Sequence, residues 1–274
     1  MSDFLSTMAH SSHLRAGEAK RRAGATGLTS RASSARPVVP LVLSATGFDL
    51  IGEVKLASPA NGRLVTADDP ERRMGELASL YQAGGAAVIS VLTEPSRFAG
   101  SLGHLETAAG VLDVPVMRKD FLVDPIQVVE ARAAGASGVL LIARLTDASL
   151  LTEMANTAIG FGMFVLVEVF DKTDLDRASV VFDMEVLIGV NTRDLTTLEV
   201  DSGRLADLAP HLPEDLPGVA ESGIKSPADA EFAAGLGYRL ALVGTSLVTS
   251  GSPEDTVRSL ISAGRIMVGT GRPS

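Results

Sequence analysis

One unit recurs along most of this chain and limits its fold more than any other feature. A short apolar run ends in a polar residue, a loop and a helical stretch follow, and a glycine precedes the next run. Short runs that are nearly continuous in Val, Ile and Leu are typical of strands buried on both faces. The pattern therefore predicts a parallel sheet covered by helices. The predicted strands lie at residues 48–55, 86–92, 115–119, 138–143, 163–169, 185–191, 217–221 and 239–244.

The ends of the helical stretches are also marked. Glycine favours the left-handed conformation that closes a helix, and Asp or Ser before a proline caps a helix start. Glycines of this kind precede strands at 83–86, 134–137 and 234–237. Capping residues accompany prolines at 68–71, 124–125, 226–227 and 252–255. Eight strands alternating with such helices predict an α/β fold, a (β/α)8 TIM barrel with an N-terminal extension. The alternative is a doubly wound open sheet, but no GxGxxG follows the first strand.

Residues 1–38 differ in composition from the rest of the chain. They carry a net charge of +4, whereas the remaining residues carry −13. We expect residues 1–12 to be disordered or loosely packed. The predicted organisation is an N-terminal arm over residues 1–47, partly disordered and with room for an extra helix, then a catalytic barrel over 48–264 and a tail over 265–274.

The composition argues against several classes of function. A net charge of −9 and a pI near 5.0 disfavour a nucleic-acid-binding surface. The chain has no cysteine, so disulfides and thiolate chemistry are excluded, and its four histidines lack metal-ligand spacing. No apolar run has the length of a membrane span, and the N-terminus lacks the pattern of a secretory signal. We therefore expect a cytoplasmic protein that uses no metal and binds no membrane.

Polar residues end most of the predicted strands, which is where barrel enzymes place their active sites. Glu53 and Lys55 alternate along the first strand and so face the same side. An ion pair of purely structural role is the alternative there, but the other strand ends are polar too. They are Lys119, Glu168, Asn191, Glu221, Ser222, Thr245 and Ser246. A closed barrel would gather them in one pocket, where we expect the pKa of a lysine to fall and that of a glutamate to rise.

Glycines follow the last two strands. Gly223 comes after Glu221-Ser222, and Gly244 comes before Thr245. Barrels frequently bind phosphate on these two loops, because glycine lets backbone N–H groups approach the anion closely. Both glycines together predict a phosphorylated small-molecule substrate.

The assembled motifs resemble the indole-3-glycerol-phosphate synthase family over residues 48–262. The matching segments are IGEVKLASP (51–59), VLTEPSRFAGSL (91–102), MRKDFLVDP (117–125), LVEV (166–169), IGVNTRDL (188–195), AESGI (220–224) and LVGTSL (242–247).

The resemblance implies a carbon–carbon lyase, a carboxy-lyase of tryptophan biosynthesis that uses no cofactor. Its substrate would be 1-(o-carboxyphenylamino)-1-deoxyribulose 5-phosphate, which loses CO₂ and water as the pyrrole ring closes. In this family Lys119 matches the general acid, Glu168 its acid/base partner, and Lys55 a residue at the carboxylate or phosphate that is also proposed as an acid in dehydration. Glu53 and Asn191 match residues that orient these groups.

The resemblance also implies the residues that hold the substrate. Phosphate-binding residues would be Gly223, Gly244 and Thr245. The remaining substrate-binding residues would be Ser58, Phe121, Leu140, Arg193, Leu195, Glu221, Ser222 and Leu242. We expect a monomer, and contact with other enzymes of the tryptophan pathway stays open.

Some positions depart from the family pattern, including Ala60, Ile126, Phe170 and Thr192. They leave open a second-copy synthase that acts on a ring-substituted anthranilate substrate. Two further alternatives are a non-catalytic barrel that binds a sugar phosphate and an isomerase of the phosphoribosylanthranilate type. The isomerase is disfavoured because that class uses a cysteine as its base.

Overall fold

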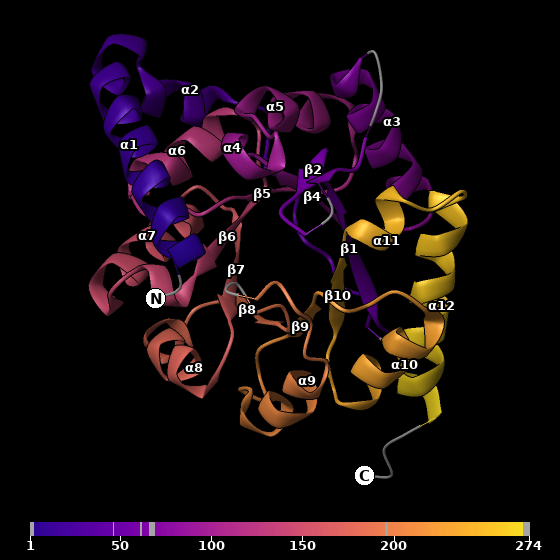
Figure 1. Ribbon diagram of the computed structural model, residues 1–274. Helices are drawn as coiled ribbons and strands as arrows, with labels where there is room; N and C mark the ends of the chain where they lie inside the picture. The colour runs from indigo at the N-terminus through magenta and orange to yellow at the C-terminus, as the bar shows by residue number, and fades with distance from the viewer. Residues whose placement is uncertain (1–2, 46, 61, 66–68, 195–196, 271–274) are drawn as a thin grey trace.

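The computed structural model describes residues 3–45, 47–60, 62–65, 69–194 and 197–270. Eight parallel strands close into a barrel in the order β1-β10-β9-β8-β7-β6-β5-β4, with helices around them (Figure 1). The closure confirms the predicted TIM barrel and excludes the open sheet. The barrel strands are β1 (Asp49–Val54), β4 (Val88–Leu92), β5 (Val116–Lys119), β6 (Gly138–Ile142), β7 (Phe164–Val169), β8 (Val186–Asn191), β9 (Gly218–Glu221) and β10 (Leu240–Val243).

Helices separate successive barrel strands, and a small antiparallel pair, β2 (Ala57–Ser58) and β3 (Gly62–Arg63), follows β1. Asp69, Asp124 and Ser226 cap the helices that begin at prolines. Gly85, Gly135 and Gly237 have φ between 87° and 97°, as predicted for glycines that end helices before strands. The helices of the barrel are α3 (Pro70–Ala83), α4 (Pro95–Phe98), α5 (Leu102–Val111), α6 (Pro125–Ala133), α7 (Ala148–Gly160), α8 (Lys172–Ala178), α9 (Gly203–Leu208), α10 (Pro227–Gly235), α11 (Thr245–Val248) and α12 (Pro253–Thr270).

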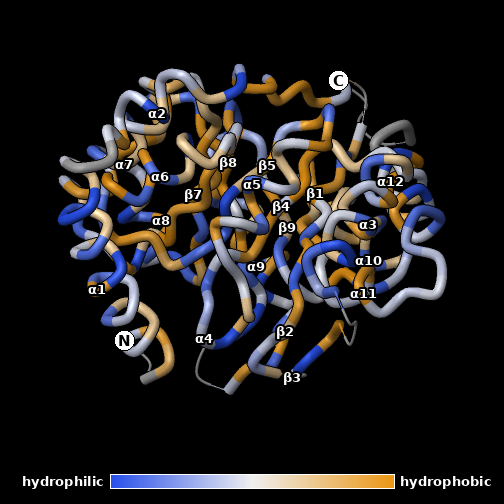
Figure 2. The backbone as a smooth tube through the Cα atoms, turned by 90° about the horizontal axis from the view of Figure 1, so that it is seen from above, coloured by the Kyte–Doolittle hydropathy of each residue, from blue (hydrophilic) through white to orange (hydrophobic). Residues whose placement is uncertain are grey.

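The strand register arranges the inward-facing side chains in layers, each supplied by alternate strands. Lower layers are apolar and fill the barrel; one of them contains Ile51, Met117, Leu166 and Val219. The outward faces of the strands pack against the helices in a second, larger cluster. In Figure 2, strands such as β1 and β7 have the colour of hydrophobic residues. The helices that surround the strands contain both hydrophilic and hydrophobic residues. Packed side chains fill the barrel core, so a substrate can bind only at the ends of the barrel.

In the described residues before the barrel there are two helices, α1 (Asp3–Thr26) and α2 (Leu28–Ser34). The expectation that residues 1–12 are disordered or loosely packed is wrong from Asp3 onward. Leu5 and Met8 are only 1% exposed, and they join the apolar cluster that also contains Phe121 and Phe170. Ion pairs add to this contact, such as that between Lys20 and Asp124. The helix is stabilised by a barrel surface far along the chain, which local composition does not reveal.

The C-terminal helix α12 also differs from expectation. It runs from Pro253 to Thr270 and so continues past residue 264, where a tail was predicted to begin. Arg265 explains part of this continuation, because its side chain donates to the carbonyl of Phe48 and pairs with Asp49 at 2.8 Å. Residues 271–274 lie outside the described part of the chain.

Candidate active site

A pocket opens at the carboxyl ends of the barrel strands, as the polar strand ends predicted. It gathers the predicted residues Glu53, Lys55, Ser58, Lys119, Phe121, Glu168, Asn191, Arg193, Glu221, Ser222, Gly223, Leu242, Gly244 and Thr245. Leu140 is not among the lining residues, and Leu195 lies outside the described residues. The expectation for Leu140 is wrong because the register puts its side chain one layer below the pocket floor, where it is fully buried.

One layer of the barrel consists entirely of charged side chains. Glu53, Lys119, Glu168 and Glu221 come from β1, β5, β7 and β9, which are alternate strands of the closed sheet. The Nζ atom of Lys119 lies 2.8 Å from Oε2 of Glu168 and 3.6 Å from Oε2 of Glu221. Because a layer in other barrels is usually filled by apolar side chains, this one forms a charged floor beneath the pocket.

The pKa of Lys119 is raised, contrary to the expectation that the pocket would lower it. Burial alone lowers the pKa of this side chain, which is 16% exposed. The negative charges of Glu168, Glu221 and Glu53 outweigh the burial, and they stabilise the ammonium form. The expectation took burial in the pocket as the dominant effect, whereas three carboxyl groups lie near the ammonium group. The other lysine of the pocket, Lys55, is paired with Glu53, whose Oε1 lies 2.6 Å from its Nζ.

The pKa of Glu221 is raised well above its usual range, as expected for a glutamate of the pocket. Burial is the main cause, and repulsion from the carboxylate of Glu168 adds to it. The side chain is accommodated by Gly189 on the next strand, where a Cβ atom would overlap Oε1 of Glu221. A carboxyl held in this way keeps its proton at higher pH than a solvated one, and it is thus suited to donate a hydrogen bond.

The layer above the charged floor lines the mouth, and it is formed by Leu92, Ile142, Asn191 and Gly244. A Cβ atom on Gly244 would overlap Oε1 of Glu53 and lie 2.8 Å from Nζ of Lys55. Gly244 thus leaves room for this ion pair, and it keeps Leu242 accessible below. Asn191 is held by its Oδ1 atom, which accepts the backbone N–H of Arg193 at 2.9 Å.

Two loops form the end of the pocket where phosphate was expected. Ser222 and Gly223 both have positive φ, at 64° and 79°, which is unusual for serine. The second loop starts helix α11 at Thr245, and the first N–H groups of a helix have no partners within it. Lys225 also lines this part of the pocket. Exposed backbone donors and a cation suit a phosphate group.

The opposite wall is aromatic and includes two residues that the sequence analysis missed. The ring of Phe121 lies 6.0 Å from that of Phe4, edge to face, and 6.2 Å from that of Phe98. Phe98 falls within the matched segment 91–102, so the resemblance could have identified it. Phe4 comes from α1, and Lys225 from a loop, and neither carried a signal in the sequence. The wall can hold a planar aromatic group.

A metal site is not indicated by the described residues, which contain no group of three or more His, Asp or Glu side chains able to hold an ion. In the same residues no helix has the length and apolar character needed to cross a bilayer.

Comparisons with known proteins show which family the chain belongs to. The family model of indole-3-glycerol phosphate synthase matches residues 15–260. The chain is 45% identical to the indole-3-glycerol phosphate synthase of Rhodococcus opacus, across 80% of this chain and 79% of that protein. It is 42% identical to that of Mycobacterium tuberculosis, across 92% of both chains. Among solved structures, 3-hexulose-6-phosphate synthase from Salmonella typhimurium superposes with a TM-score of 0.65 at 14% identity, covering 80% of this chain and all of that one, which shows the fold alone.

Proposed function

The chain belongs to the indole-3-glycerol phosphate synthase family, and we propose that Lys119, Glu168, Lys55, Glu53 and Asn191 carry out its reaction. The enzyme is a carboxy-lyase of tryptophan biosynthesis. It converts 1-(o-carboxyphenylamino)-1-deoxyribulose 5-phosphate to indole-3-glycerol phosphate, and each turnover releases one CO₂ and one water. The observation that carries the assignment of residues is the charged floor, in which an ammonium group lies between two carboxyl groups beneath an aromatic wall.

The substrate would span the pocket. Its phosphate would bind the two loops that contain Ser222, Gly223, Gly244 and Thr245, near Lys225. Its aromatic ring would lie against Phe121 and Leu242, and Ser58 and Arg193 would contact the groups between these ends. This orientation places the ketone of the sugar chain over the charged floor.

The first step forms the carbon–carbon bond. The ring carbon that bears the carboxylate attacks the ketone carbon, and the carbonyl oxygen takes a proton from the ammonium group of Lys119 to become a hydroxyl. The raised pKa of Lys119 keeps it protonated at neutral pH, and an alkoxide is a stronger base than an amine, so the transfer is favourable. Glu168, 2.8 Å away, stabilises the ammonium group before the transfer.

The attack leaves a cationic ring system, and its carbon–carboxylate bond then breaks to release CO₂. Negative charge from Glu53 and Glu168 would stabilise this cation in the partly dehydrated pocket. In the last step the new hydroxyl leaves as water. The hydroxyl takes a proton from Lys55 as it leaves. Glu168 then removes a proton from the neighbouring ring carbon, and this loss makes the pyrrole ring aromatic. Asn191 would orient the substrate hydroxyls at the mouth.

A direct assay tests this function. The purified protein is mixed with the ketose phosphate, and indole-3-glycerol phosphate and CO₂ are measured together. Equal amounts of both products are expected. Substrate bound without turnover would instead support a non-catalytic barrel. Comparing ring-substituted substrates with the unsubstituted one tests the second-copy alternative, which fails if kcat/KM is no higher for any of them.

We also propose that the enzyme works as a monomer in the cytoplasm. The charged floor, the two loops proposed for the phosphate and the aromatic wall are all present within the described chain, so the proposed reaction does not require a second copy. A molecular mass near 28.4 kDa in solution is expected from light scattering. A dimer mass would contradict the proposal.

A further inference from the structure

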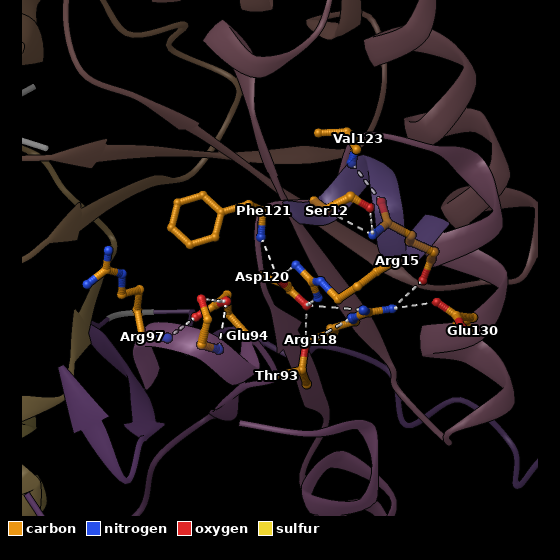
Figure 3. A network of polar contacts seen from close by, with 12 residues as sticks. Ser12, Arg15, Thr93, Glu94, Arg97, Arg118, Asp120, Phe121, Val123 and Glu130 are labelled. Atoms are coloured by element: carbon orange, nitrogen blue, oxygen red, sulfur yellow. Dashed lines mark hydrogen bonds and ion pairs between the residues drawn. The ribbon is translucent and has the colours of Figure 1, made fainter. Parts of the chain in front are cut away.

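The carboxylate of Asp120, the residue after Lys119, is buried at the edge of the pocket and surrounded by donors (Figure 3). Its Oδ2 atom accepts from Thr93 Oγ1 at 2.7 Å and from Arg118 Nη2 at 3.1 Å. Its Oδ1 atom accepts the backbone N–H of Phe121 at 2.8 Å. Arg15 of α1 binds both oxygens, at 2.7 and 2.9 Å. Burial alone would raise the pKa of Asp120, but these contacts lower it to about 2, so the group is an anion at neutral pH.

Thr93 connects this carboxylate to the backbone of Lys119. The N–H group of Thr93 donates to the carbonyl of Lys119 at 3.0 Å, while its hydroxyl donates to Asp120. The same hydroxyl oxygen accepts from Nε of Arg118 at 3.0 Å. One residue just after β4 therefore contacts residues 118, 119 and 120, two of them through its hydroxyl and Lys119 through its N–H group.

Arg118 lies on the opposite side of β5 from Lys119, since neighbouring residues of a strand face opposite sides. Its guanidinium group is almost fully buried, and its Nη1 atom donates to the carbonyl of Gln127 at 2.8 Å. Glu130 lies 3.6 Å from the same nitrogen. Asp120 supplies a further negative charge next to this cation. The contacts of Arg118 and Asp120 thus anchor the chain on both sides of Lys119.

We propose that Asp120, Thr93 and Arg118 are positioning residues that set the direction of the Lys119 side chain toward Glu168 and the substrate ketone. They act through Lys119 rather than on the reacting atoms. A rotation of the β5 end by a few degrees would move the Nζ atom, at the end of a long side chain, by a large part of an ångström. Misplacement of this size is enough to slow proton transfer strongly. The inference rests on the proposed role of Lys119 as proton donor.

The least disruptive substitution is Thr93→Val. Valine has nearly the same shape as threonine and keeps the backbone hydrogen bond to Lys119, but it lacks the hydroxyl that binds Asp120. Thr93→Val is expected to lower kcat by about 10- to 100-fold with little change in KM. Thr93→Ser restores the hydroxyl and should keep kcat within about threefold of the wild type. Asp120→Asn should lower kcat at least as much as Thr93→Val. All rates are taken below the onset of thermal unfolding of each variant.

A matched control separates this effect from general loss of stability. Asp49 is also a buried carboxylate paired with an arginine, but it lies at the start of β1, at the far end of the barrel. Asp49→Asn should lower the melting temperature and leave kcat unchanged. If Thr93→Val also leaves kcat unchanged, or if Thr93→Ser loses as much as Thr93→Val, the positioning role is refuted.

A double-mutant cycle tests whether the unit acts through Lys119. In a Lys119→Met background, adding Thr93→Val should leave the residual rate unchanged, because there is no ammonium group left to position. An equal loss in both backgrounds would overturn the inference. These failures differ from failure of the proposed function, which would show as wild-type activity in the Lys119→Met single variant.

Discussion

Lys119 and Glu168 contact each other through the barrel interior, with 2.8 Å between Nζ and Oε2, although they are 49 positions apart in the sequence and strand β6 lies between their strands. The contact exists because alternate strands of the barrel place inward side chains at the same height. The two groups proposed as general acid and as its acid/base partner are therefore fixed by the register of the sheet. The same register adds Glu221 as a third member, 3.6 Å from Nζ.

Replacing Lys119 by methionine should remove the proposed proton donor while keeping most of the side-chain volume. We expect kcat to fall by about 10²- to 10⁴-fold, the usual range for a lost general acid. The circular dichroism spectrum should be unchanged. Steady-state kinetics with the ketose phosphate provide the measurement, and a kcat near that of the wild type would show that another group donates the proton.

The carboxyl group of Glu221 makes stability depend on pH. Its pKa is raised in the folded state above the value of 4.5 that applies when it is unfolded. The folded state therefore binds more protons, and stability falls as pH rises from 4.5 toward the folded pKa, by at most about 1.4 kcal/mol per pH unit. Glu221→Gln should flatten this dependence.

Urea unfolding of the wild type and Glu221→Gln at pH 5, 6, 7 and 8 measures the effect. The difference in unfolding free energy should shift in favour of the glutamine variant as pH rises. Lys119 does not affect this comparison. Its pKa is raised in the folded state, so its contribution to the free energy of unfolding stays constant until the pH passes 10.5. Parallel curves for the two proteins would mean that Glu221 ionises normally.

The strands were largely predictable because their signals are local. Each barrel strand lies within two residues of its predicted range, and glycines such as Gly135 and caps such as Asp124 explain why. Glu53, Lys119 and Glu221 were likewise predicted to share a pocket, since parallel strands in a closed barrel end on one rim. The roles assigned to these residues, and the division of the chain into arm, barrel and tail, stay predictions.

Other features depend on contacts that a linear pattern does not contain. The helix α1 is stabilised by partners more than a hundred residues away, such as Asp120 for Arg15. The direction of the pKa shift at Lys119 follows from three carboxyl groups on other strands. Leu140 was expected to bind the substrate, but the strand register puts its side chain one layer below the charged floor, where it is fully buried.

A substitution at Gly244 tests whether the Glu53–Lys55 ion pair requires a residue without a side chain at this position. This glycine was predicted to bind the phosphate, but a Cβ atom there would collide first with Glu53 and Lys55. Gly244→Ala should therefore lower kcat as well as raise KM. Gly75→Ala is the control, because a Cβ in the middle of α3 meets nothing within 4 Å. It should leave the kinetics unchanged and stabilise the protein slightly. A change in KM alone would indicate that Gly244 serves only the phosphate.

Phe4 is the residue that α1 contributes to the aromatic wall. Its ring packs edge-on against Phe121 at 6.0 Å and lines the pocket. Phe4→Ala should raise KM by about 3- to 10-fold, since one aromatic pair is worth about 0.5–1.5 kcal/mol. The charged floor is untouched, so kcat should change little.

Leu14→Ala provides the comparison for Phe4, because Leu14 lies on the same helix with 60% of its surface exposed. It removes a similar amount of apolar side chain without touching the pocket, and its KM should match the wild type. If both variants raise KM equally, the helix acts through its overall docking and Phe4 makes no specific contact with the substrate ring. If only Phe4→Ala does so, the wall of the pocket includes a residue from outside the barrel.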